Sequence, residues 1–269
     1  ERITKYMMSA LLVLMLVLAV HSALLDGAAD GLAFYLTPDF SKINGSVIVG
    51  AMNQAFFTLS TGMGGMAIFG SYIDKDHSLM GESVNVIVLD TFVAILAGFI
   101  IFPACSTYGL EVNAGPSLLF DTMASVFNHM AGGRIWGTMF FLFMIFAALS
   151  TVLGVCENIL AMVRELTGWS RPKGCIICGT GIFLLALTTA LGYSVIHFQP
   201  FAEGTAWLDL WDFIVSNNVL PLGSLVLTLF CCNKFGWGWD NFVREANTGR
   251  GLKIRPWMRP VFQYITPVI

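Results

Sequence analysis

Long apolar segments alternate with short polar ones along this chain of 269 residues. A membrane-spanning helix needs about 20 consecutive, mostly apolar residues. Segments of roughly that length run over 6–25, 47–72, 84–102, 135–163, 174–193 and 210–232. The pattern therefore predicts an all-α integral membrane protein with six transmembrane helices.

The second of these segments is interrupted in its middle by small and polar residues. Its hydroxyls and glycines are Thr58, Ser60, Thr61, Gly62, Gly64 and Gly65. Backbone groups released from a helix cannot face lipid, because they would be left there without hydrogen bonds. A broken helix is tolerated at this depth where it lines a cavity or binds a ligand, although small residues also form close helix contacts. Three glycines beside three hydroxyls exceed what close contact needs, so we favour a discontinuous helix with a substrate or ion site.

Composition supports the membrane assignment and narrows the function. The chain is 56% hydrophobic and 12% charged, whereas ordinary soluble domains are about 25% charged. We therefore expect a protein embedded in the lipid bilayer, with no soluble domain of useful size. No His/Asp metal set, Ser/His pair or nucleotide-binding loop is evident. We expect no enzyme activity, no organic cofactor and no nucleic-acid partner, and the sequence does not define an oligomeric state.

The basic residues segregate to one side of the membrane. If the six segments alternate in direction, only Lys42 and Arg134, of 14 Lys and Arg, fall on the outer side. Because cytoplasmic loops carry an excess of Lys and Arg, the richer face is predicted to be cytoplasmic. Both ends of the chain then lie inside, and a change of one in the number of spans would destroy this segregation.

The two longer outer connections differ in character. The first, 26–46, contains acidic residues, proline and glycine and is expected to be a solvated connection. Within the second, 103–133, the stretch 118–127 is amphipathic at helical spacing. It is expected to form a short helix that caps the outer mouth or lies at the lipid interface.

Ionisable and hydroxyl groups inside the apolar segments are candidate functional residues, because a charge at membrane depth is costly unless it is paired or hydrated. Asp90 is either a cation ligand or a neutral structural partner, and Glu157 is equally either a functional acid or a structural partner. Ser150 and Thr151 either bond back to carbonyl groups one turn earlier or contribute to a sodium site.

These features together resemble the neurotransmitter:sodium symporter family, and particularly its bacterial amino-acid transporters. The most specific piece is QAFFTLSTGMG at 54–64, which looks like the unwound sixth helix of that family. The run SYIDKD at 71–76 resembles the end of that sixth helix and the loop after it, and FAALST at 146–151 resembles the eighth helix. The run DLWDF at 209–213 resembles the start of the tenth helix, and YITP at 264–267 resembles the start of the eleventh.

The resemblance implies a leucine-transporter-like inverted-repeat fold, of which the chain spans helices five to ten. Residues 6–25 would then be the last helix of the first repeat, and 47–232 would belong to the second repeat. Residues 233–269 would form a cytoplasmic loop and the start of another helix. Together with a first residue that is Glu rather than Met, this leads us to expect a single transmembrane domain, 1–269, that is a fragment of a larger transporter in a bacterial inner membrane.

The resemblance also implies roles for individual residues. Thr58 and Asp90 would bind a first sodium ion, and the Ala147 carbonyl with Ser150 and Thr151 a second. The substrate pocket would be lined by Phe57, Thr58, Ser60, Met63, Thr151 and Val155, with Phe57 as its lid. Asp212 matches an outer gate, Glu165 and Tyr72 an inner gate, and Gln54 a residue beside the chloride site of the family.

Two positions depart from the family pattern. The position of Asp90 is usually Asn, and Ala94 stands where chloride-dependent members carry serine. Asp90 would therefore supply the negative charge that chloride otherwise brings. Met63 stands where an aromatic residue is frequent, and a flexible Met side chain tolerates varied apolar shapes.

The sequence thus predicts a secondary active transporter that couples sodium to the symport of a neutral, hydrophobic or aromatic amino acid by alternating access. The alternative is an ion channel or receptor-like membrane protein with a cation site at the membrane midplane. Sodium-dependent uptake that saturates with substrate would separate the two.

Overall fold

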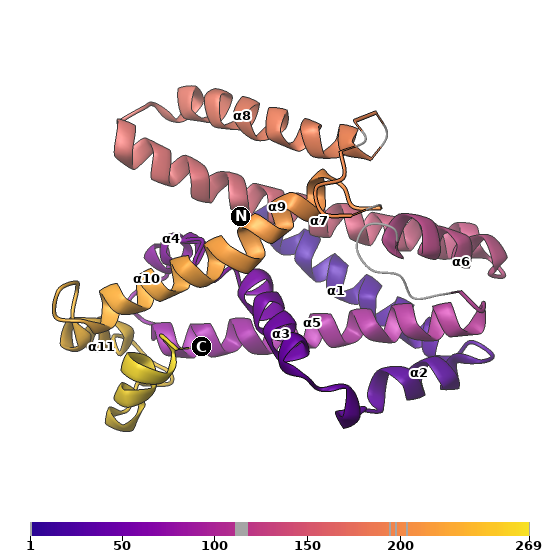
Figure 1. Ribbon diagram of the computed structural model, residues 1–269, viewed down its shortest axis with the longest axis horizontal. Helices are drawn as coiled ribbons and strands as arrows, with labels where there is room; N and C mark the ends of the chain where they lie inside the picture. Colours follow the sequence, from indigo (N-terminus) through magenta and orange to yellow (C-terminus); the bar gives the residue numbers. More distant parts are fainter. Residues whose placement is uncertain (1, 111–117, 194, 197, 203, 269) are drawn as a thin grey trace. The chain divides into compact units, whose positions relative to one another are not determined.

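The computed structural model describes residues 2–110, 118–193, 195–196, 198–202 and 204–268. Every named element in this part of the chain is a helix (Figure 1). The α-helices are α1 (Arg2–Ala23), α2 (Ala28–Leu36), α3 (Gly45–Thr58), α4 (Gly65–Ser71), α5 (Leu79–Thr107), α6 (Met123–His129), α7 (Gly133–Thr167), α8 (Arg171–Gly192), α9 (Trp207–Ile214), α10 (Leu220–Cys232) and α11 (Trp239–Ala246). Shorter helical turns are η1 (Phe40–Lys42), η2 (Leu118–Thr122), η3 (Val215–Val219), η4 (Pro256–Met258) and η5 (Val261–Ile265). The predicted all-α class is confirmed.

Within the described residues, five helical segments are long and apolar enough to cross a membrane. They are Lys5–Ala23, Leu79–Thr107, Gly133–Thr167, Arg171–Gly192 and Trp207–Cys232. The remaining predicted span, the second one at 47–72, is divided into α3 and α4, neither of which is long enough alone. The expected discontinuous second helix is therefore confirmed.

The first outer connection is more ordered than its composition predicts. Instead of a purely solvated loop, 26–46 contains the nine-residue helix α2. Its Tyr35 ring stacks on Phe102 of α5 with 4.7 Å between ring centres. A side chain at Gly31 would meet the Phe102 carbonyl oxygen at 2.4 Å. Most of the connection is exposed, as expected, and it also contains a short helix that packs on α5, which its turn-forming Asp and Gly residues did not indicate.

The second outer connection contains the short helix that the amphipathic pattern predicts. Residues 118–127 form η2 and most of α6, and Met123, Val126 and Phe127 are buried. Residues 111–117 of the same connection lie outside the described part of the chain.

The chain divides into two compact units. The first unit contains the residues up to Ile43 together with Leu89–Gly154. Its core is built by α1, α5, α6 and α7 around fully buried side chains such as Met15, Cys105 and Phe140. His21 of α1 also stacks on Trp136 of α7, with 3.7 Å between ring centres. Aromatic and aliphatic packing therefore holds this unit together.

The second unit contains Asn44–Val88 and Val155–Ile269. In it, α10 contacts α3, α11 and η5, and α9 contacts α8. The turn η3, a five-residue π-helix, joins α9 to α10 and also contacts α3. Both halves of the broken helix belong to this unit, so their surroundings within it can be described directly.

Two loops of the second unit bond to each other through their backbones. The Ser78 N–H donates to the Arg250 carbonyl oxygen at 2.9 Å, and the Arg250 N–H donates to the Asp76 carbonyl oxygen at 2.7 Å. The buried Ser78 hydroxyl donates to the Leu252 carbonyl oxygen at 2.8 Å. A side chain at Gly249, where φ is +80°, would meet the backbone of Lys75 and Asp76 at 2.6 Å. The loop after α4 is thereby joined to the loop after α11.

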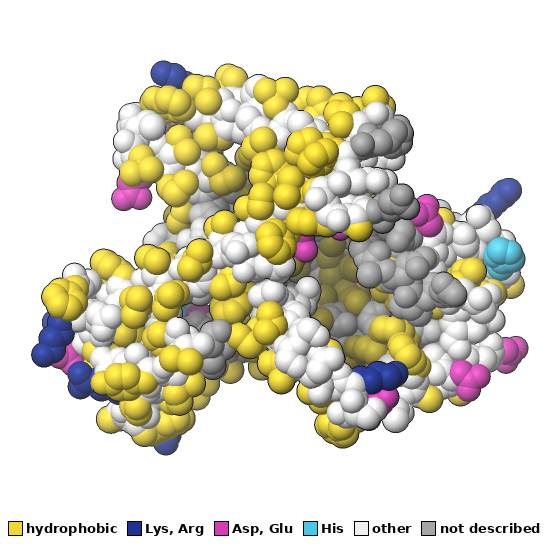
Figure 2. Space-filling view, viewed as in Figure 1, with side chains coloured by type: hydrophobic (Ala, Val, Ile, Leu, Met, Phe, Trp, Pro, Cys, Tyr) yellow, Lys and Arg dark blue, Asp and Glu magenta, His cyan; other side chains and the backbone are white. Residues whose placement is uncertain are grey.

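The helix surfaces carry many apolar side chains. Figure 2 shows them over much of α8, where Ile176, Phe183, Leu184 and Leu185 are all more than half exposed. In water, an apolar surface of this extent would favour association. The exposed apolar side chains of these helices are therefore suited to contact with lipid.

Candidate functional site

The break between α3 and α4 is a change of backbone conformation over Leu59 to Gly64. Gly62 and Gly64 have φ angles of +80° and +76°. Ser60 has φ of +51° and is the one non-glycine residue with a positive φ among the described residues. Left-handed conformations are disfavoured for side-chain-bearing residues, and such strain clusters at ligand-binding and switching sites. The backbone at Ser60 therefore marks this segment as a candidate functional site.

Local hydrogen bonds close the end of α3. The Leu59 N–H donates to the Ala55 carbonyl oxygen at 3.2 Å. The Thr61 N–H donates to the Phe56 carbonyl oxygen at 3.0 Å, and the Thr61 hydroxyl contacts the same oxygen at 3.3 Å. After this point the helical ladder stops, and it resumes at the Gly64 carbonyl group. Broken transporter helices bind ligands with backbone released in this way, and such a role for this segment stays a prediction.

The unwound segment lies directly against the backbone of α10. A side chain at Gly62 would meet the Leu220 carbonyl oxygen at 2.2 Å and the Ser224 N–H nitrogen at 2.8 Å. A side chain at Gly223 would in turn meet the Gly62 carbonyl oxygen at 2.4 Å. Gly62 therefore has a packing role. From the sequence alone, close packing and ligand binding were both possible reasons for a glycine at this position. At Gly64, in contrast, an added Cβ atom would meet nothing within 4 Å.

The residues expected to line a substrate pocket are divided between the two units. Phe57, Thr58, Ser60 and Met63 lie around the break, and the Phe57 and Met63 side chains are exposed in the second unit. Thr151 and Val155 lie four residues apart on the continuous helix α7, so they share one face of it. The assembly of the whole set into one pocket stays a prediction.

The hydroxyls expected at a sodium site gather around one carbonyl group of α7. Ser150 Oγ donates to the Ala147 carbonyl oxygen at 2.8 Å, and Thr151 Oγ1 donates to it at 3.1 Å. Bonding back to the preceding turn is the ordinary behaviour of Ser and Thr in helices. Each hydroxyl oxygen keeps lone pairs while its proton is donated, so the two hydroxyl oxygens can still ligate a hard cation. Their role as sodium ligands stays a prediction.

The other predicted sodium ligands lie on different helices. Thr58 is the last residue of α3. Asp90 lies in the interior of α5, which begins at Leu79, before the predicted start of this span. Among the described residues, there is no cluster of three or more His, Cys, Asp or Glu that could hold a metal ion. A cation site in this part of the chain would depend on hydroxyl and carbonyl oxygens as well as on Asp90.

Glu157 forms an ion pair in this structure. Its Oε2 atom accepts a hydrogen bond from Arg171 Nη2 at 2.7 Å, and the two groups form an ion pair. Arg171 is the first residue of α8, after a short turn that follows α7. This pair was not predicted from the sequence, although a basic residue at the start of the next helix was an available signal.

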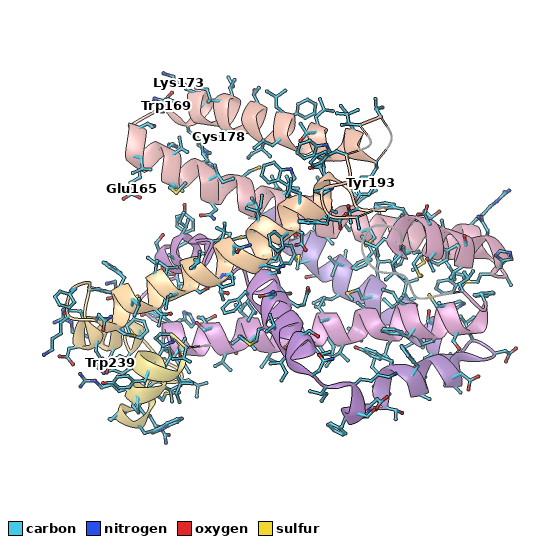
Figure 3. The ribbon with its side chains drawn as sticks, in the orientation of Figure 1. Glu165, Trp169, Lys173, Cys178, Tyr193 and Trp239 are labelled. Atoms are coloured by element: carbon cyan, nitrogen blue, oxygen red, sulfur yellow. The ribbon has the colours of Figure 1, made fainter. Side chains whose placement is uncertain are left out.

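The predicted gate residues lie at helix ends or beside turns. Asp212 of α9 accepts a hydrogen bond from Ser216 Oγ at 2.6 Å. Tyr72 follows α4 and is exposed. Glu165 lies near the end of α7, as labelled in Figure 3. After it, Trp169 of the turn lies beside Lys173 of α8, with 4.9 Å between Lys173 Nζ and the Trp169 ring centre. The gating roles of these residues stay predictions.

Gln54, the predicted neighbour of a chloride site, lies in α3 next to a contact that the sequence analysis missed. The adjacent Asn53 donates from Nδ2 to Oδ1 of Asn217 in η3 at 2.8 Å. The two residues are 164 positions apart in sequence. No local pattern pairs them, and the one available signal was an amide within each apolar segment.

Comparison with known proteins identifies the family. The model of the sodium:neurotransmitter symporter family matches residues 3–269. An uncharacterized sodium-dependent transporter of Haemophilus influenzae is 34% identical over 230 residues, which are 86% of this chain and 50% of that protein. The sodium-dependent transporter YhdH of Bacillus subtilis is 33% identical over 86% of this chain and 51% of its own length.

A solved structure agrees with these sequence relatives. The crystal structure of MhsT in complex with L-phenylalanine superposes with a TM-score of 0.86 at 36% identity, over 98% of this chain and 59% of that chain. The chain spans about half the length of the curated relatives that it matches. Its family and fold are those of secondary transporters rather than enzymes. The chain is a multi-pass membrane protein with the leucine-transporter fold and belongs to the sodium:neurotransmitter symporter family.

Proposed function

We propose that the full-length protein couples inward sodium movement to the uptake of a neutral, hydrophobic or aromatic amino acid by alternating access. The observation that carries this proposal is the helix broken between Thr58 and Gly65, with Ser60 held in a left-handed conformation. An unwound segment of this kind can meet the charged ends of an amino acid with backbone groups, while apolar side chains meet the rest.

The substrate class rests on the side chains around the break. Phe57 and Met63 are apolar and exposed within their unit, and so is Val155 on α7. The similar protein MhsT was crystallised with L-phenylalanine. These two facts support an apolar amino acid over an acidic or basic one.

The ion and the orientation complete the proposal. Sodium would be bound by Thr58 and Asp90 at one site, and by Ala147, Ser150 and Thr151 at the other. The relatives are named sodium-dependent transporters, which supports this choice of ion. We place the protein in a bacterial inner membrane with residues 1–5 and 233–260 on the cytoplasmic side, because most Lys and Arg fall there.

Uptake into proteoliposomes tests the proposal. The full-length protein would be reconstituted and given an inward sodium gradient, with choline replacing sodium as the control. Labelled phenylalanine, leucine and tryptophan should enter in a saturable, sodium-dependent manner, whereas glutamate and lysine should not. A sodium conductance without saturable uptake would instead favour the ion-channel alternative.

Substitution of Met63 should change the ranking of substrates. Met63→Phe adds a rigid ring to the proposed pocket and should shift preference towards smaller aliphatic amino acids. Such overpacking is worth about 1–3 kcal/mol, which is enough to reverse a modest ranking. Competition by a panel of unlabelled amino acids measures it. Met66→Phe is the matched control, since Met66 is similarly exposed but lies within α4. The same ranking in the wild type and in Met63→Phe would place Met63 outside the pocket.

A further inference from the structure

An amide pair joins the outer half of the broken helix to the segment that carries the predicted gate acid. Asn53 lies in α3 and Asn217 lies in η3, and Asn53 Nδ2 is 2.8 Å from Asn217 Oδ1. Both belong to the second unit, in which α3 and η3 are in contact. Each amide lies within an apolar segment, where an unpaired polar group is costly. Mutual hydrogen bonding therefore favours keeping these two segments together.

The position of Asn217 connects this pair to Asp212. The turn η3 is a π-helix, a distortion of α-helices that is frequent at functional sites. Ser216, the residue before Asn217, is buried and donates from its hydroxyl to Asp212 Oδ1 at 2.6 Å. The turn η3 therefore contacts Asp212 through Ser216 and α3 through Asn217.

The position of Asn53 connects the pair to the predicted substrate lid. Phe57 follows Asn53 by four residues on α3, so the two side chains lie on the same face of the helix. A displacement of α3 at Asn53 would therefore displace Phe57 as well. The Asn53–Asn217 hydrogen bond thus relates the position of Phe57 to that of Asp212.

A second contact holds the broken helix to α10, the helix that follows η3. Beyond Phe57, Gly62 packs on the α10 backbone at Leu220 and Gly223, with no room for a side chain on either glycine. Packing of backbone against backbone leaves little freedom to adjust. The amide pair, in contrast, is a contact between two side chains that can rotate about their own torsions, which makes it the more adjustable of the two contacts.

We propose that Asn53 and Asn217 are positioning residues that hold α3 to the α9–η3 segment and so set the placement of the substrate lid relative to the outer gate. This role in transport rests on the proposed function. The contact itself does not, because it concerns the local stability of α3 and can be measured without substrate.

Hydrogen–deuterium exchange of the full-length protein in detergent tests the contact. Asn53→Ala or Asn217→Ala should increase amide exchange in α3 by about twofold to tenfold, the range expected for one neutral hydrogen bond. The double substitution should add little to either single one, since all three remove the same bond. Asn218→Ala is the matched control, because Asn218 bonds within its own segment, from Nδ2 to the Phe213 carbonyl oxygen at 2.8 Å. It should leave exchange in α3 unchanged.

Uptake kinetics test the role in transport. Asn53→Ala and Asn217→Ala should raise KM for the amino acid by a similar factor and non-additively, with a smaller change in kcat, whereas Asn218→Ala should change neither. Unchanged exchange in α3, or equal effects of Asn217→Ala and Asn218→Ala, would overturn the contact. If exchange in α3 changes as expected but the effects on KM are additive or absent, the positioning role is overturned. An absence of uptake in the wild type as well would contradict the proposed function instead.

Discussion

Asp90→Ala in the full-length protein should weaken sodium-dependent substrate binding by well over tenfold. If Asp90 is a sodium ligand, the substitution removes a negative charge from beside the ion. Two unit charges about 4 Å apart attract by about 4 kcal/mol at an effective dielectric constant near 20, and about 1.4 kcal/mol corresponds to tenfold in affinity. Loss of only half of that attraction would therefore still lower the affinity by more than tenfold. A sodium titration of the binding of a labelled amino acid would measure the loss.

Two further variants separate charge from structure at this position. Asp90→Asn keeps the size and hydrogen-bonding capacity of the side chain but removes its charge. It should also weaken sodium binding if the charge matters, and it should resemble the wild type if Asp90 is a neutral structural partner. Glu82→Ala is the control, because it removes an acid from the first turn of the same helix, α5. An unaltered sodium titration in well-expressed Asp90→Ala protein would remove Asp90 from the sodium site.

Gly62→Ala should destabilise the protein far more than Gly64→Ala does. Both glycines have left-handed φ angles, +80° and +76°, so each substitution incurs the backbone penalty of about 1–2 kcal/mol. Only at Gly62 does the added methyl group meet another backbone, with the Leu220 carbonyl oxygen at 2.2 Å. Overpacking adds about 1–3 kcal/mol or more, because neither backbone can rotate away as a side chain can.

Thermal unfolding of the two purified variants compares these costs directly. Gly64→Ala is expected to lower the melting temperature by a few degrees, since it carries the backbone penalty alone. Gly62→Ala is expected to melt well below it and to lose substrate binding, since the unwound segment must leave α10. Equal losses in both variants would mean that the packing of Gly62 on α10 contributes nothing beyond the backbone conformation.

The membrane helices could be predicted from sequence because their signal is local. Length and apolar content define a span without reference to its partners, so α1, α5, α7, α8 and the α9–α10 segment correspond to predicted segments. The break in 47–72 was predictable for the same reason, because glycines and hydroxyls interrupt a local pattern. The roles of the predicted site residues and the repeat boundaries stay predictions.

The contacts that hold the site in place were not predictable in this way. The Asn53–Asn217 and Glu157–Arg171 pairs join residues that are 164 and 14 positions apart. Composition reports which groups are polar but not which polar group each will meet. Gly62 shows the same limit, since a glycine needed for close packing and one needed for backbone conformation look identical in sequence. Helix α2 was missed because turn-forming residues dominate the composition of its segment.

The central claim is that sodium and an amino acid bind to the full-length protein as coupled ligands. Equilibrium binding of labelled phenylalanine to the purified protein, across a range of sodium concentrations with choline as the balancing cation, tests it most directly. Because coupling between two sites is reciprocal, sodium should increase the affinity for the amino acid, and the amino acid should increase the affinity for sodium by the same factor. Binding of a neutral amino acid with the same Kd in sodium and in choline would contradict the account.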